Sequence, residues 1–205
     1  MLARFYKYAD LIIDKIEGGY YNPTRHNTNN MGSSGETMMG IDRANGGSDI
    51  KDSPDGQKFW ALVDANSGSW KYNFKGGAIE SELRKLAAQM MYNRYERYSN
   101  SYLTADARKK VSQSPKLETH FFYACWNGAG RFQTFAKEFI SAVTAGQNIS
   151  QLEQTALNSR LNSSVALLRT GGALLRDKIW PELSSSGGGW LWWIIAAGIG
   201  VYFFI

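Results

Sequence analysis

Apolar residues recur at helical spacing along most of this 205-residue chain, and this periodicity limits the folds that it can adopt. Near the start, the repeat predicts an amphipathic helix over residues 2–17 that ends at Gly18-Gly19. Three further helices are predicted, over residues 57–66, 78–98 and 104–113. Since 43% of the residues are apolar, the chain can bury a sizeable core. We therefore expect a mainly α-helical domain.

A strongly apolar helix is predicted to form the centre of this core. Ser114-Pro115 is typical of an N-cap followed by proline at the first helical position, and the helix that it opens ends at Asn127-Gly128. Cys125 lies within the apolar run, so we expect a buried, unreactive thiol. The remaining helices are predicted over residues 132–143 and 161–183, the latter with a break at Gly171-Gly172.

Two polar segments divide the chain. Residues 20–56 are rich in Asn, Gly, Ser and Asp, and only residues 37–41 among them are able to form a strand. This loop or small β region is long enough to suspect a function. Residues 184–189, Ser-Ser-Ser-Gly-Gly-Gly, have the composition of a flexible linker. We therefore expect a single domain over residues 1–183.

The last segment, residues 190–205, carries no charge and has tryptophans at one end and other aromatic residues at the opposite end. As a helix it would be about 24 Å long, slightly less than the ~30 Å hydrocarbon core of a bilayer. Aromatic residues at both ends are typical of the two membrane interfaces. We interpret the segment as a C-terminal transmembrane anchor, with a buried core helix as the alternative. The N-terminus lacks an apolar run of signal-peptide length, so we expect no secretion by such a signal.

The net charge of +5 favours an acidic partner, which could be nucleic acid, an anionic membrane or a wall polymer. The basic residues, among them Arg84, Arg94 and Arg97, are scattered and no nucleic-acid-binding motif frames them. We therefore expect them on a solvated surface and expect no nucleic-acid partner. One cysteine and two histidines cannot form a disulfide or a structural zinc site, so we expect no metal and no cofactor.

Glu17 is the residue on which the predicted chemistry depends. It falls in the last turn of the predicted first helix, where the negative end of the helix dipole disfavours a carboxylate. The apolar neighbours Ile13 and Ile16 would add desolvation, and both effects raise the pKa of Glu17. A glutamic acid that stays protonated near neutral pH can donate a proton to a glycosidic oxygen. The alternative is a helix that ends in a glycine cap, with an incidental glutamate.

The sequence Glu-Gly-Gly-Tyr at residues 17–20, followed by Gly-Glu-Thr-Met-Met-Gly-Ile at residues 35–41, resembles the phage and bacterial N-acetylmuramidases of glycoside hydrolase family 108. Residues 82–96 and 122–130 resemble that family's helix before the core and its apolar helix ending in an Asn-Gly turn. The resemblance implies an α+β lysozyme-like fold, mainly α with a small β element. It also implies that the protein cleaves the glycan strand of peptidoglycan and that Glu17 is the catalytic acid.

The chain departs from the family in having no acidic residue between Glu17 and Glu36. Inverting hydrolysis needs a second carboxyl group ~6.5 to 9.5 Å from the first, so Glu36 or Asp42 would have to act as the base. Thr37 could instead help to position the water. Aromatic faces and amides suit sugar rings, which makes four further residues candidates for the walls of a groove: Tyr20, Tyr21, Trp126 and Asn127. Core packing is an equal alternative for Trp126.

Three functions therefore remain open at this level. The first is a muramidase, a bacteriolytic hydrolase. The second is a lytic transglycosylase in which Glu17 acts alone, first as acid and then as base. The third is a membrane-anchored wall-binding or virion structural protein without activity. The expected partners are the peptidoglycan strand, a lipid bilayer through residues 190–205, and other virion proteins. A C-terminal anchor together with a phage-like resemblance suggests a bacteriophage whose virion has its own membrane, or the host inner membrane during infection.

Overall fold

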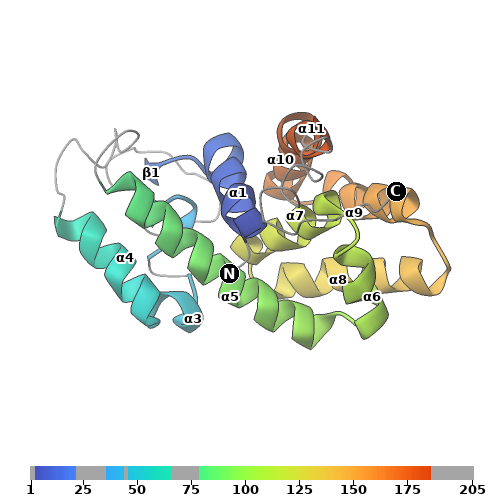
Figure 1. Cartoon of the computed structure of the whole chain (residues 1–205), viewed down its shortest axis with the longest axis horizontal. Helices are drawn as coiled ribbons and strands as arrows, with labels where there is room; N and C mark the ends of the chain where they lie inside the picture. Colours follow the sequence, from blue (N-terminus) through green and yellow to red (C-terminus); the bar gives the residue numbers. More distant parts are fainter. Residues whose placement is uncertain (1–2, 22–35, 44–45, 66–78, 186–205) are drawn as a thin grey trace, which may run out of the picture.

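The computed structural model describes residues 3–21, 36–43, 46–65 and 79–185, and this part of the chain is mainly helical, as predicted (Figure 1). Its α-helices are α1 (Ala3–Ile12), α3 (Ser48–Lys51), α4 (Pro54–Ala65), α5 (Glu80–Tyr102), α6 (Ala105–Val111), α7 (Pro115–Ala124), α8 (Ala129–Thr144), α9 (Ile149–Leu161), α10 (Ala166–Leu174) and α11 (Trp180–Ser185). Shorter helical turns cover Ile13–Glu17, Cys125–Asn127 and Leu175–Ile179.

The longest helix, α5, runs diagonally from one end of the molecule to its middle (Figure 1). At one end it packs against α4, which lies beside α3, and near its middle it packs against α1. At the other end it packs against α8 and α7, within the group of helices from α6 to α11. The helix therefore links a small part of the molecule, which contains α3 and α4, to a larger helical part.

A small antiparallel sheet belongs to the smaller part. Its strands are β1 (Tyr20–Tyr21), β2 (Thr37–Met38) and β3 (Ile41–Asp42), in the order β1-β2-β3. Met38 pairs with Ile41, so that Met39 and Gly40 form a two-residue turn in which both residues have positive φ, 53° and 72°. Such a turn is typical of a tight hairpin, and it divides the stretch that the sequence predicted as one strand.

The helix α7 forms the centre of the core, as predicted. The side chain of Ser114 accepts a hydrogen bond from the backbone N–H of Leu117 at 3.3 Å, and proline occupies the first turn. Every residue from Leu117 to Ala124 is buried. Cys125 is also buried, and burial raises the pKa of its thiol, which favours the unreactive form.

Two predictions about the helices after residue 144 were wrong. The helix α9 was not predicted, although Asn148 and Gln151 form a capping box that opens it. The expected break at Gly171-Gly172 does not occur, because α10 continues through both glycines. A side chain at Gly171 would come within 2.7 Å of the Tyr123 hydroxyl oxygen, and one at Gly172 within 2.9 Å of the Cβ atom of Arg160. Close packing, not a bend, therefore accounts for this pair.

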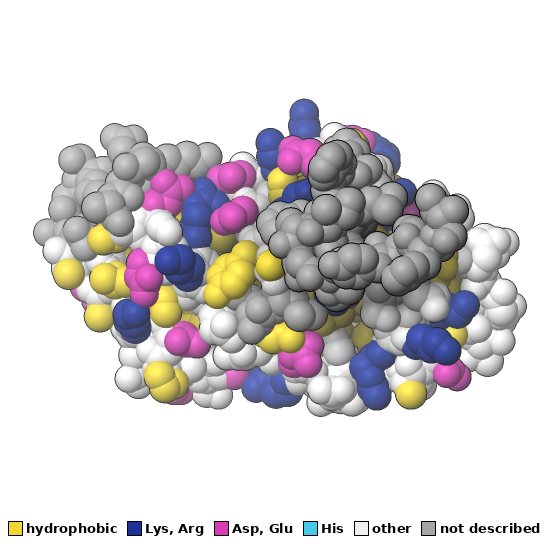
Figure 2. All heavy atoms as spheres, in the orientation of Figure 1, with side chains coloured by type: hydrophobic (Ala, Val, Ile, Leu, Met, Phe, Trp, Pro, Cys, Tyr) yellow, Lys and Arg dark blue, Asp and Glu magenta, His cyan; other side chains and the backbone are white. Residues whose placement is uncertain are grey.

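Positive and negative side chains are interspersed on the described part of the face that Figure 2 shows. Arg84 is typical, because it forms ion pairs with Glu80 at 2.7 Å and with Asp14 at 2.7 Å. Arg94 contradicts the prediction of a solvated residue, since it is only 6% exposed and lies between α5 and the smaller part of the molecule. Its burial follows from its ion pair with Asp49 of α3.

Within the described ranges, we find no helix with the length and apolarity to cross a bilayer. The predicted anchor, residues 190–205, and linker residues 186–189 lie outside the described part of the chain. The membrane anchor therefore stays a prediction.

Candidate functional site

Glu17 lies at the end of a π-helical turn, Ile13–Glu17, which continues α1. The turn closes where the backbone N–H of Gly18 donates to the carbonyl oxygen of Ile13 at 2.8 Å, with Gly18 at a φ of 68°. Single π-helical turns occur frequently at functional sites. The Glu17 side chain that this turn presents is half-buried.

Three of the described residues act on the Glu17 carboxyl group or pack against it. The hydroxyl of Tyr123, on α7, forms a hydrogen bond with it, and the charge of Arg160, on α9, acts on it. Gly40 packs so closely against it that a Cβ atom on this glycine would lie 2.8 Å from Cδ of Glu17. Burial raises the pKa of Glu17 to about 7, against the opposing effects of Tyr123 and Arg160. The predicted rise is therefore present, and burial is its largest cause.

Arg160 is fully buried behind Tyr123. Its guanidinium carbon lies 4.5 Å from the centre of the Tyr123 ring. It donates hydrogen bonds to Oδ1 of Asn127 at 3.0 Å, to the backbone carbonyl of His120 at 3.0 Å and to Nδ1 of His120 at 3.3 Å. Burial lowers the pKa of His120 well below its usual value, and the charge of Arg160 acts in the same direction, so the imidazole is neutral.

The β2–β3 turn is held against Glu17 by two hydrogen bonds. The N–H of Met39 donates to the carbonyl oxygen of Gly19 at 3.1 Å, and the indole N–H of Trp126 donates to the carbonyl oxygen of Met39 at 3.1 Å. These bonds connect the end of the first helix, the hairpin and the end of α7. Gly40 is therefore fixed where its missing side chain leaves room for the carboxyl group of Glu17.

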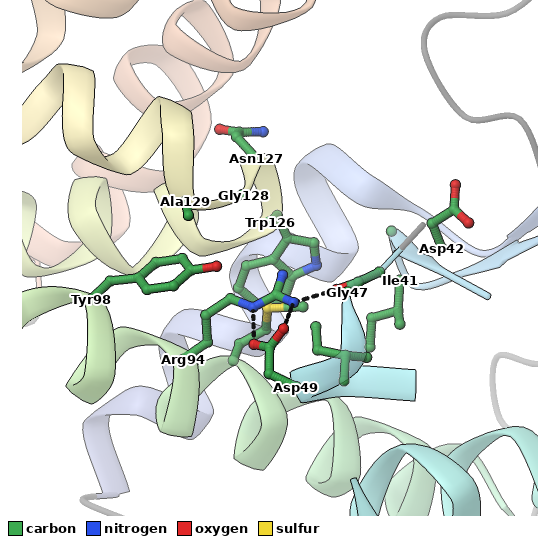
Figure 3. A pocket seen from close by; sticks show the side chains of 14 residues that line it. Ile41, Asp42, Gly47, Asp49, Arg94, Tyr98, Trp126, Asn127, Gly128 and Ala129 are labelled. Atoms are coloured by element: carbon green, nitrogen blue, oxygen red, sulfur yellow. Dashed lines mark hydrogen bonds and ion pairs between the residues drawn. The ribbon is translucent and has the colours of Figure 1, made fainter. Parts of the chain in front are cut away.

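A pocket of about 300 Å³ opens beside this cluster, between the smaller part of the molecule and the larger helical part (Figure 3). Arg94 and Asp49 face each other in it through two hydrogen bonds of 2.8 and 2.9 Å, with Tyr98 and Trp126 beside them (Figure 3). Gly40 and Asn127 also line the pocket, whereas Glu17 is adjacent to it through Gly40. The pocket combines aromatic, charged and amide groups.

The candidates for a second carboxyl group differ in their surroundings. Glu36 forms an ion pair with Arg43 at 2.7 Å, and Arg43 also binds Asp64 of α4. Asp42 lines the pocket, and Figure 3 shows its carboxyl group apart from the Arg94–Asp49 pair. Thr37 is the partner of Asp42 across β2 and β3 and is half-buried. Of the two predicted bases, Asp42 thus lies nearer to the pocket.

The four predicted groove residues lie in different places. Trp126 lines the pocket and also contacts Phe122 in the core, so both of its predicted roles agree with its position. Asn127 lines the pocket with an amide that is turned away from the Arg94–Asp49 pair (Figure 3) and bound to Arg160 and Tyr123. Tyr20 and Tyr21 form β1, which pairs with β2, and their side chains lie outside the described part of the structure.

We compared the chain with known protein families, with characterised proteins and with solved structures, and none matches it.

Sequence reasoning missed several residues of this site, among them Tyr123, Arg160, Arg94 and Asp49. Arg160 follows Leu152 and Ala156 at intervals of four along the buried face of α9, and an arginine on an apolar stripe is the signal that could have revealed it. Arg94 and Asp49 are 45 positions apart, and no local pattern in the sequence marks them as partners.

Proposed function

We propose that this protein is a peptidoglycan glycosidase with a lysozyme-like fold, a muramidase that cleaves the glycan strand with Glu17 as the proton donor. The observation that carries the proposal is a half-buried glutamic acid with a pKa of about 7 beside a pocket with aromatic and polar walls. At neutral pH a large fraction of such a group is protonated, as general acid catalysis requires. The resemblance of residues 17–20 and 35–41 to the muramidases supports the same substrate.

In the proposed reaction, Glu17 gives its proton to the bridging oxygen while the bond between that oxygen and the anomeric carbon breaks. The sugar passes through an oxocarbenium-like transition state, and water attacks the anomeric carbon. A carboxylate takes the proton that the water loses. We assign this second role to Asp42, because Asp42 lines the pocket and Glu36 does not. No metal or cofactor enters the proposed reaction.

A lytic transglycosylase is the second candidate, and the ion pair of Glu36 with Arg43 favours it. If Asp42 does not act as a base, Glu17 has to take back a proton after donating one. The proton would then come from a hydroxyl group of the sugar itself, whose oxygen replaces water and closes a 1,6-anhydro ring.

The test is the activity of the full-length chain in detergent on purified peptidoglycan. We expect the natural protein to release soluble fragments and Glu17→Gln to reduce the rate by at least about 100-fold, since general acid catalysis contributes about 10² to 10⁴. The basic limb of the pH profile should lie near 7, because activity is lost as Glu17 ionises. Glu82→Gln is the matched control, since Glu82 is exposed and bound to Lys58.

Mass spectrometry of the fragments separates the candidates. Reducing muramic acid ends indicate hydrolysis, and 1,6-anhydro ends indicate transglycosylation. If Glu17→Gln remains fully active, Glu17 is not the acid and both candidates fail. Binding of peptidoglycan without any cleavage would instead identify a wall-binding protein.

A further inference from the structure

A buried arginine behind the proposed acid binds no carboxylate in the described part of the chain. Arg160 is 0% exposed, and among the described residues its hydrogen bonds go to Asn127 and His120 only. Burying a guanidinium group without a bound carboxylate is costly. Burial lowers the pKa of Arg160 to about 10, so the group still carries its charge at neutral pH.

The ring of Tyr123 lies between this charge and Glu17. The guanidinium group lies over the face of Tyr123, and the hydroxyl of Tyr123 is bound to Glu17. A cation over the ring makes the phenol a better hydrogen-bond donor, because neighbouring polar groups polarise one another in a buried network. The side chain of Asn127 binds both the guanidinium group and the phenol, which fixes their relative position.

The helix α10 keeps this pair in place from behind. Gly171 packs against the Tyr123 hydroxyl and Gly172 against Arg160, at distances that leave no room for a side chain. Close packing on this side limits the movement of Tyr123 and Arg160, which helps to hold the carboxyl group in one orientation.

We propose that Arg160 is a positioning residue of the reaction proposed above: acting through Tyr123, it orients the carboxyl group of Glu17 and stabilises the carboxylate that remains after proton transfer. The catalytic role of Arg160 rests on the proposed function. The O–H of Tyr123 stays bonded to Glu17 while the proton of Glu17 moves to the leaving oxygen. No further proton transfer is needed.

Other charged residues near Glu17 in the described part of the chain are engaged elsewhere. On its own helical turn, Asp14 forms an ion pair with Arg84 at 2.7 Å and Lys15 with Glu182 at 3.3 Å. The hairpin and α10 present glycines to this cluster. Among the described residues, Arg160 is therefore the charged group that acts on Glu17, and Tyr123 is the titratable group in contact with it.

The experiment is an NMR titration of the full-length chain with ¹³C-labelled glutamate carboxyl groups, in which the signal of Glu17 is the one absent from Glu17→Gln. We expect Tyr123→Phe and Arg160→Gln each to raise the pKa of Glu17 by about one unit, because both changes remove support for the carboxylate. The double variant should shift it by less than the sum, since the arginine acts through the tyrosine.

Two controls change similar residues outside the cluster. Tyr95→Phe removes a buried hydroxyl that is bound to Ser99, and Arg108→Gln removes an arginine that donates to backbone carbonyls. Both should leave the pKa of Glu17 where it is in the natural protein. If Arg160→Gln does not fold, Tyr123→Phe still tests the path through the phenol, because an unchanged pKa of Glu17 in that variant overturns the proposal.

The titration does not depend on peptidoglycan, so the two proposals fail separately. A shifted pKa in a protein that cuts no peptidoglycan would refute the proposed function and leave the coupling between Arg160 and Glu17 intact. In an active enzyme, the basic limb should move upward in Tyr123→Phe by the same amount, with a lower kcat and a similar KM. A changed KM with an unmoved pH profile would contradict the proposal.

Discussion

At the scale of single residues, the ionisation of Glu17 couples the stability of the protein to pH. Its pKa is about 7 in the folded protein and 4.5 in a free side chain, so the folded state binds the proton more tightly than the unfolded state. The free energy of unfolding therefore falls as the pH rises from about 4.5 through 7. Below 4.5 both states are protonated, and Glu17 has no effect on the pH dependence there.

We expect this loss to disappear in Glu17→Gln. Relative to that variant, the natural protein should lose about 3 kcal/mol of stability between pH 4 and pH 8, because each unit of pKa shift corresponds to about 1.4 kcal/mol. Urea unfolding at the two pH values measures the difference. If the free energies of unfolding of the natural protein and of Glu17→Gln differ by the same amount at both pH values, the pKa of Glu17 is not raised.

The second residue-scale prediction concerns Gly40. Its φ of 72° is unfavourable for other residues, and a Cβ atom would press against Glu17. Gly40→Ala should therefore lower the free energy of unfolding by about 1 to 3 kcal/mol. It should also reduce activity by about tenfold or more, which corresponds to a transition state that is less stable by about 1.4 kcal/mol because Glu17 is displaced. Thermal unfolding and the cleavage assay measure the two effects.

Gly146→Ala separates the two causes. Gly146 has a similar φ of 76° but nothing within 4 Å of the position of a Cβ atom. This variant should lose stability through backbone strain alone and keep its activity. Equal activity in both variants would show that the space beside Gly40 is not needed by Glu17.

At the scale of helices and strands, the periodicity of apolar residues predicted most of the helices, because it is a local pattern. The helices around α5 and α7 follow from apolar spacing and from the Ser114-Pro115 cap, both of which act within one or two turns. The sequence could not reveal why Gly171 interrupts the pattern, because the cause is Tyr123, 48 positions away. It placed Glu17 correctly at a helix end, but the partners of this residue come from three other elements.

Gly171→Ala tests this account of α10. Helix propensity alone predicts a gain of up to about 1 kcal/mol from replacing a glycine in a helix by alanine. The new methyl group would instead collide with the hydroxyl of Tyr123, so we expect a loss of about 1 to 3 kcal/mol. Gly130→Ala, at an exposed position of α8 with open space around it, should be neutral or stabilising. Denaturant unfolding of both variants distinguishes packing from propensity.

At the scale of the whole molecule, the pocket depends on the contact between two parts that α5 holds together. Gly40, Asp42 and Asp49 come from the smaller part, while Trp126 and Asn127 come from the end of α7. Arg94 of α5 joins them through its ion pair with Asp49. No single segment of the sequence contains the site. The sequence could therefore suggest individual residues of the pocket walls, but not which of them lie together.

Residues 190–205 supply the prediction at this scale. The full-length chain should sediment with membranes and need detergent for extraction, while a chain that ends at residue 185 should stay in the aqueous fraction and keep its activity. Ala197→Arg should weaken insertion by about 2.5 to 3.5 kcal/mol. If the shortened chain unfolds, or if the full-length chain needs no detergent, the segment is a buried core helix.

The direction of the Glu17 side chain depends on the number of residues in the π-helical turn that carries it. A regular α-helix advances by about 100° per residue, and a π-helical turn accommodates one residue more than an α-helical turn does. A chain one residue shorter between Ile13 and Glu17 could continue as an ordinary helix with the same amino acids at its end. Its glutamate would then keep about the same direction, whereas a regular α-helix of the present length would turn Glu17 about 100° away from Tyr123. An insertion in this turn should accordingly be tolerated less than substitutions at its exposed positions.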